Sequence, residues 1–137
     1  MALARLCYVS QATKPNHRIR EDLMDIINEA VEFNTEHQIY GVLYYGHGFF
    51  FQCLEGERAE IDAVFYERIR SDRRHKNVIL LQFITINEIR FESWNMKFAP
   101  HEKGLMHFFS DQDKPEFNPY LLKDEQLPKF LDVLYAA

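Results

Sequence analysis

The spacing of apolar residues divides the first hundred positions into alternating strands and helices. A strand is predicted from Leu3 to Ser10. A helix follows from about His17 to His37, because apolar residues recur there at helical spacing. The stretch 41–56 predicts two strands joined at Gly46-His47-Gly48, where glycine allows the positive φ that a tight turn needs.

The pattern continues with a helix over Glu57–Ser71, an apolar strand over Val78–Ile86 and a last strand over Arg90–Phe98. Alternation in the last strand predicts that Trp94 and Met96 share one face. The predicted order is therefore β-α-β-β-α-β-β. Without its last strand this is the ferredoxin-like α+β fold, in which two helices cover one face of a sheet.

The character of the sequence changes after Pro100. Prolines, a glycine and mixed charges predict a loop over 101–119, with a short helix near Leu105–Phe109. One or two short helices are predicted over 119–137, and their apolar face must pack on the free face of the sheet or on another protein. We therefore expect one domain over 1–100 and a helical C-terminal extension over 101–137, which is too short for a second domain.

The two amphipathic helices are expected to lie side by side over the sheet, with a slot between them. Apolar walls with a few convergent polar groups are typical of a site for a flat ligand. The residues expected to line or floor this slot are Tyr8, Ile26, Ile27, Asn34, Gln52 and Arg68.

Three polar features near the slot each have two interpretations. Gln52 lies in a nearly apolar strand, so its carboxamide bonds either to the backbone or a core hydroxyl, or to a ligand. Asn34, on the apolar stripe of its helix, either closes the last turn or faces a ligand. The cationic run 70–76 either complements the helix dipole or holds a phosphate group.

Composition and charge narrow the class of protein. The chain has 137 residues, 47% hydrophobic and 27% charged, which is ordinary for one globular domain. A net charge of −5 argues against direct binding to nucleic acid, and no apolar run reaches membrane-spanning length. Cys7 and Cys53 lie in predicted strands, which suggests buried free thiols and a cytoplasmic location; no Cys/His spacing predicts a metal site.

Several segments together resemble the BLUF domains, blue-light sensors that use FAD. No single segment is specific, but their order and spacing match the family over roughly residues 3–98. The remaining tail resembles that of the short, single-domain members, which have no enzymatic output domain. The matching segments are Leu6–Ser10, Asn34–Gly41, Phe51–Gly56, Arg68–His75 and Arg90–Met96.

The resemblance implies a non-covalent FAD between the two helices. Tyr8 would be the photoactive tyrosine, and Gln52 would lie between it and the flavin. Asn34 would bond the flavin ring, which Ile26 and Ile27 would flank.

The resemblance also implies roles at the edges of the slot. Ser10, Arg68, Arg74 and His75 would contact or stabilise the cofactor, and Trp94 with Met96 would be the last-strand pair whose environment changes on illumination. The chain departs from the common family pattern at Phe33, Gln38, Tyr40 and Asn95, which surround the site and bear on the tuning of the photocycle.

The implied function is a light switch and not an enzyme. Tyr8 would give an electron and a proton to the excited flavin, and Gln52 would relay the proton and settle in a new arrangement. The signal would leave through the last strand and the C-terminal segment to a separate regulatory protein, such as a transcription regulator. The oligomeric state stays open, self-association included.

Two other functions compete with the sensor. One is a small acyl-phosphate hydrolase in which Arg74 and Asn34 bind a phosphate, although the required backbone loop is missing after the first strand. The other is an interaction module without a cofactor. The colour of the purified protein separates them, because only the sensor would be yellow.

Overall fold

The computed structural model describes residues 2–15, 18–99, 120 and 122–136. It contains a five-stranded sheet in the order β4-β1-β3-β2-β5. The first four strands pair antiparallel, and β5 pairs parallel to β2. The strands are β1 (Leu3–Ala12), β2 (Tyr40–Gly46), β3 (Phe49–Glu57), β4 (His75–Ile86) and β5 (Lys97–Ala99).

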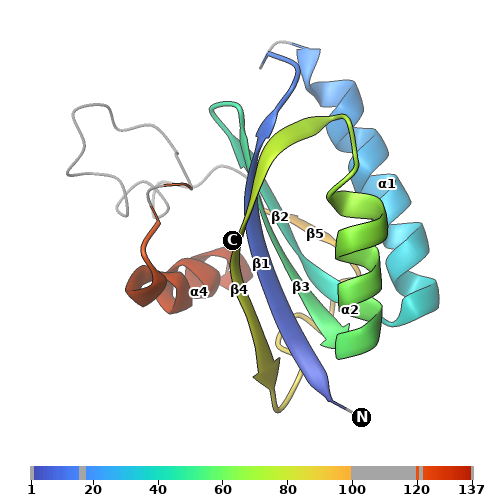
Figure 1. Cartoon of the computed structure of the whole chain (residues 1–137), viewed down its shortest axis with the longest axis vertical. Helices are drawn as coiled ribbons and strands as arrows, with labels where there is room; N and C mark the ends of the chain where they lie inside the picture. The colour runs from blue at the N-terminus through green and yellow to red at the C-terminus, as the bar shows by residue number, and fades with distance from the viewer. Residues whose placement is uncertain (1, 16–17, 100–119, 121, 137) are drawn as a thin grey trace.

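Helices cover both faces of this sheet (Figure 1). Helices α1 (Arg20–His37) and α2 (Arg58–Val64) lie side by side on one face, and α4 (Leu127–Ala136) lies on the other. The arrangement is the expected ferredoxin-like α+β fold with a short C-terminal helix. Among the described residues, none of the helices combines the length and apolar character that crossing a membrane requires.

Alternate residues of the same strands pack into two separate hydrophobic cores, one on each face of the sheet. The helix-side core, beneath α1 and α2, includes Leu6, Leu43, Leu54, Ile61, Phe65 and Met96. The α4-side core includes Cys7, Val9, Phe51 and Phe91 together with the apolar face of α4, which is Leu127, Phe130, Leu131 and Leu134. The C-terminal helix therefore packs on the free face of the sheet, one of the two expected outcomes. The short helix expected near 105–109, and the boundary expected at 100, lie outside the described residues.

The second helix differs from its prediction in its hydrogen bonding. After Val64 it continues as a π-helix, η2 (Phe65–Ile69), and the amide of Arg70 donates to the carbonyl of Phe65 at 2.9 Å. Single π-turns inside helices are rare and are often found at functional sites. Here the π-turn sets the positions of Arg68 and Ile69, which both face the pocket described below.

The last strand is much shorter than the predicted strand over Arg90–Phe98. The amides of Arg90 and Phe91 both donate to the fully buried carboxylate of Glu55, at 2.9 Å each. These amides therefore need no neighbouring strand, and regular pairing begins only at Lys97. Because the segment before Lys97 is not a strand, the expected alternation fails, and the prediction that Trp94 and Met96 share a face was wrong. Met96 packs in the helix-side core and Trp94 against the α4-side core.

Candidate functional site

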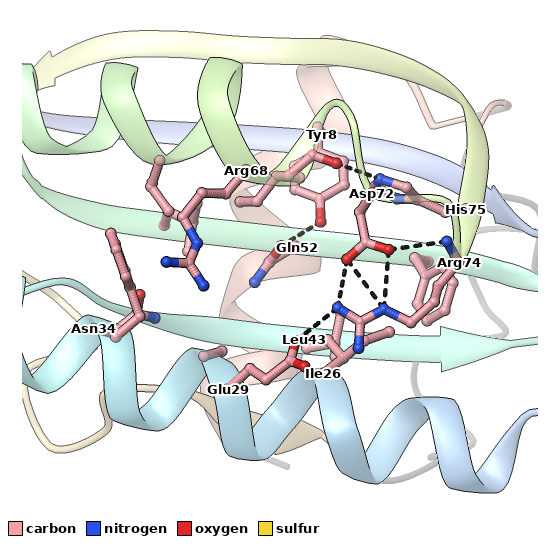
Figure 2. Close-up of a pocket in the computed structure, with 16 residues that line it drawn as sticks. Tyr8, Ile26, Glu29, Asn34, Leu43, Gln52, Arg68, Asp72, Arg74 and His75 are labelled. Atoms are coloured by element: carbon pink, nitrogen blue, oxygen red, sulfur yellow. Dashed lines mark hydrogen bonds and ion pairs between the residues drawn. The ribbon is translucent and has the colours of Figure 1, made fainter.

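A pocket lies on the sheet between α1 and α2, where the slot was expected (Figure 2). Its lining combines apolar side chains from both helices and the sheet with a few polar groups. The lining residues are Tyr8, Ile26, Glu29, Ala30, Phe33, Asn34, Leu43, Phe50, Gln52, Leu54, Val64, Arg68, Ile69, Asp72, Arg74 and His75.

Tyr8 and Gln52 form a buried pair on the floor of this pocket. They stand directly opposite each other on β1 and β3, and the Tyr8 hydroxyl donates to Oε1 of Gln52. Their side chains are only 4% and 5% exposed. Burial, with a smaller contribution from the Asp72 carboxylate, raises the pKa of Tyr8 well above its ordinary value, so the phenol stays neutral. The first interpretation of Gln52 is confirmed, because its carboxamide bonds a core hydroxyl, and contact with a ligand stays a prediction for a side chain that lines the pocket.

The other end of the Gln52 carboxamide faces the segment that leads into β5. Nε2 of Gln52 donates to the thioether sulfur of Met96 at 3.7 Å. A thioether is a weak acceptor, so this contact holds the amide loosely. Trp94 lies on the opposite side of the sheet, where its ring centroid is 5.5 Å from that of Tyr135 on α4. Met96 is thus the member of the pair that contacts Gln52.

Asn34 connects the end of α1 to that same segment. Its side chain, 3% exposed, donates to the carbonyl of Asn95 at 2.8 Å, and the side chain of Asn95 donates to the carbonyl of Ile39 at 3.0 Å. The backbone carbonyl of Asn34 also accepts from the amide of Ile39, which closes the helix end. Among the described residues, no partner is recorded for Oδ1 of Asn34, an acceptor on a pocket-lining side chain.

An ion-pair cluster spans the mouth of the pocket. Arg74 bonds Asp72 through Nε at 2.9 Å and reaches Glu29 on α1 through Nη2 at 2.7 Å (Figure 2). Burial alone would raise the pKa of Asp72, but the hydrogen bonds from Arg74 hold it below its ordinary value. Sequence reasoning assigned no role to Glu29 or Asp72. Glu29 lies three positions after Ile26, so the helical spacing of the pocket-facing residues could have indicated it.

His75 connects β1 to the π-turn behind the pocket. Its Nε2 lies 2.6 Å from the carbonyl of Ile69, and its Nδ1 lies 2.7 Å from the hydroxyl of Ser10. A carbonyl only accepts, so Nε2 carries the hydrogen, and Nδ1 of the neutral ring accepts from Ser10. Ser10 itself is fully buried and is not part of the pocket lining, and its hydroxyl contacts the lining residue His75.

The remaining expected site residues are placed as follows. Arg68 lines the pocket, with its guanidinium carbon 4.2 Å from the ring centroid of Phe33. Ile26 forms part of the wall. Ile27 is half-buried against the helix-side core and lies beside the lining. Among the described residues, no cluster of His, Cys, Asp or Glu is arranged to hold a metal ion.

Known proteins resemble this chain in sequence. The family profile described as BLUF, sensors of blue-light using FAD, matches residues 3–97. The photoactivated adenylate cyclase subunit beta of Euglena longa is 37% identical over 103 residues, which cover 73% of this chain. The match spans only 11% of that cyclase subunit.

Solved structures extend the resemblance to nearly the whole chain. BlsA in its photo-activated state is 41% identical, with a TM-score of 0.90 over 98% of this chain and 96% of that one. BlsA in its ground state gives a TM-score of 0.91 at the same identity, over 98% of this chain and 89% of that one. The matched family consists of sensors, so residues 3–97 form a sensor domain and not a catalytic one. This excludes the alternative function of an acyl-phosphate hydrolase. The chain therefore belongs to the BLUF family of blue-light sensors.

Proposed function

We propose that this protein binds FAD non-covalently between α1 and α2 and uses it as a blue-light photoreceptor. The observation that carries the proposal is the buried Tyr8–Gln52 pair on the floor of a largely apolar pocket. A neutral phenol bonded to a carboxamide is an electron and proton donor joined to a group that can relay the proton.

The residues of the pocket suit a flavin. A flavin ring is flat and apolar on both faces, and its edge carries hydrogen-bond donors and acceptors. Ile26 and Leu43 offer apolar wall, and the carboxamides of Asn34 and Gln52 offer donors and acceptors for the edge. Ile27 supports the wall from the core beside it.

The outer part of FAD carries a ribityl chain and a diphosphate. Arg68, Arg74 and His75 line the pocket and would contact that part, and the Ser10 hydroxyl contacts His75. Guanidinium groups suit phosphate and carbonyl oxygens, because their N–H donors form a planar fork.

Light would act through a change at Gln52. A bound flavin would supply blue-light absorption and, once excited, an acceptor for one electron. Tyr8 would give that electron with its proton, and Oε1 of Gln52, already bonded to the phenol, would receive the proton. Gln52 would pass a proton on toward the flavin, and the electron and a proton would then return to Tyr8, so nothing is consumed. Gln52 would be left in another orientation or tautomer, from which it would donate to the flavin C4 carbonyl; that bond would lower the excitation energy and shift absorption to the red. Two states that differ by a few kcal/mol are enough for such a switch.

The signal would leave through the segment between Trp94 and Lys97. A reoriented Gln52 would lose its weak contact with Met96. On the other side of the sheet, Lys97 donates to the carbonyl of Tyr135 at 2.8 Å, and Trp94 packs on the same residue. This segment therefore contacts both Gln52 and α4, and a change in it would alter how α4 presents itself to a separate regulatory protein, such as a transcription regulator.

The test is the absorption spectrum of the purified protein before and after blue light. We expect flavin bands that shift to the red and recover in the dark. Tyr8→Phe and Gln52→Leu should keep FAD bound, because the apolar walls are unchanged, and both should lose the normal shift. Tyr44→Phe is a matched control, because Tyr44 is equally buried but lies in the α4-side core; it should keep the shift. A normal spectral shift in Tyr8→Phe would show that Tyr8 is not the electron donor. A colourless purified protein would contradict flavin binding.

A further inference from the structure

Four side chains form a continuous bridge between the two helices that bound the pocket. The Phe33 ring of α1 stacks on His37 one turn later, with centroids 4.0 Å apart and an interplanar angle of 19°. The guanidinium of Arg68, from η2, lies over the Phe33 ring at 4.2 Å. Nδ1 of His37 lies 2.8 Å from the carboxylate of Glu60 on α2.

Arg68 differs from the other pocket arginine in its partners. Arg74 is held by two carboxylates, those of Asp72 and Glu29. Among the described residues, none forms a hydrogen bond or an ion pair with the guanidinium of Arg68. The guanidinium instead makes a cation–π contact with the Phe33 ring. Its N–H donors are therefore available to a ligand in the pocket that it lines (Figure 2).

We propose that Phe33 is a positioning residue that holds the Arg68 guanidinium at the mouth of the pocket, ready for the oxygen atoms of the bound cofactor. The inference rests on the proposed function, because it takes FAD as the ligand. It assigns a role to a residue at which the chain departs from the common family pattern.

The physical reason is preorganisation. Arg68 is exposed, and a free arginine side chain loses rotamer entropy when a ligand fixes it. The Phe33 ring restricts the guanidinium before the ligand arrives, and a cation–π contact at an exposed site contributes about 0.5–1 kcal/mol. The stack on His37 holds the ring, and Glu60 holds His37, so the guanidinium has a fixed support.

The experiment is a double-mutant cycle on the full-length protein loaded with FAD. The variants are Phe33→Leu, Arg68→Met and the two combined, and the measurement is the release of FAD on serial dilution, followed by flavin fluorescence at several salt concentrations. Phe33→Leu should weaken binding about two- to fivefold in the wild-type background. It should change binding little when Arg68 is already Met.

A second readout separates positioning from general packing. Attraction between Arg68 and the anionic part of FAD is screened by salt, so the affinity should fall as salt rises. Arg68→Met and Phe33→Leu should both flatten this dependence, and Phe33→Tyr, which keeps the ring, should restore it. Phe33→Met repeats the test if Phe33→Leu lowers the melting temperature.

Tyr66 and Arg70 supply the matched control. The Arg70 guanidinium lies over the Tyr66 ring at 5.7 Å on the same helical segment, and neither residue lines the pocket. Tyr66→Leu should leave FAD affinity and its salt dependence unchanged. The inference would be overturned if Phe33→Leu lowered FAD affinity equally in the wild-type and Arg68→Met backgrounds, or if Phe33→Leu left the salt dependence of the affinity unchanged. Either result would leave flavin binding itself intact. A wild-type protein that binds no FAD would overturn the proposed function, and this inference with it.

Discussion

Tyr8 is a buried phenol packed among the apolar side chains of the helix-side core, and its hydroxyl donates to Gln52. The ring centroids of Phe65 and His75 lie 5.5 and 5.9 Å, respectively, from the centroid of the Tyr8 ring. This environment disfavours the phenolate, which would be buried next to the Asp72 carboxylate. The residue therefore keeps its proton in the folded protein, as the proposed transfer toward a bound flavin requires.

The raised pKa of Tyr8 predicts a loss of stability in alkali. Above about pH 10 an unfolded chain ionises this tyrosine while the folded protein does not, so the folded state binds more protons and the free energy of unfolding falls as pH rises. One such group contributes a slope of at most about 1.4 kcal/mol per pH unit. We expect Tyr8→Phe to show a shallower decline than wild type in urea unfolding between pH 9 and pH 11. Equal slopes in the two proteins would contradict the burial of a neutral Tyr8.

The sequence indicated the pocket residues that are polar within an apolar run. It did not indicate the pocket residues that match their neighbours in character. Gln52 and Asn34 stand out because each is polar among apolar neighbours. Glu29 is one of many charged residues on its helix, and only its place three positions after Ile26 indicates that it faces the pocket. Phe33 is apolar on an apolar stripe, and its contact with Arg68 depends on the separation of two helices, which spacing does not give.

At the scale of elements, Glu55 fixes the path of the chain between β4 and β5. Its carboxylate accepts from the guanidinium of Arg5 at 2.8–2.9 Å and from the amides of Arg90 and Phe91. The carboxylate is fully buried, yet all of these donors satisfy it. It thereby sets where the segment carrying Trp94 and Met96 begins.

Replacing Glu55 should therefore cost far more than replacing a surface carboxylate of the same region. Glu55→Gln removes the charge and one acceptor and leaves Arg5 unpaired, so we expect the free energy of unfolding to fall by about 3 kcal/mol. Asp132→Asn breaks the exposed ion pair of Arg90 with α4 and should cost less than about 1 kcal/mol. Denaturant melts of the two variants give the comparison, and similar losses would show that Glu55 does not anchor the segment.

The same contacts explain which elements the sequence could predict. Strands β1, β3 and β4 form long, mainly apolar runs and helix α1 has apolar residues at helical spacing, so their approximate positions follow from local pattern. The last strand looked long because its apolar residues alternate, but the acceptor for the amides of Arg90 and Phe91 is Glu55, distant in sequence. The π-turn after Val64 was likewise not predicted, because the apolar spacing indicated only an ordinary helix over Glu57–Ser71.

At the scale of the molecule, one sheet separates the proposed flavin site from α4. The segment 94–97 contacts both sides, Gln52 through Met96 and α4 through Trp94 and Lys97, and it is the route that we propose for the signal. Strand β5 pairs with β2 over only three residue pairs, so it is the least firmly held strand of the sheet.

Hydrogen exchange in the dark and under blue light tests this route. We expect light to increase exchange in residues 90–98 and 122–136 and to leave β1 unchanged, because β1 pairs along its length with β3 and β4. Gln52→Leu should remove the difference between light and dark. Identical exchange in both conditions, alongside a normal spectral shift, would mean that the signal leaves through α1, α2 or the hairpin.

The pairing of β1 with β3 also limits how this chain can change in length. Tyr8 faces Gln52, and the next pair, Cys7 and Cys53, belongs to the opposite core. A single inserted residue in either strand would exchange the two faces and replace the phenol and the carboxamide by a thiol or a phenyl ring. Insertions are therefore excluded from β1 and β3. The turn at His47-Gly48, where a Cβ on Gly48 would meet open space, can lengthen without moving Tyr8 or Gln52.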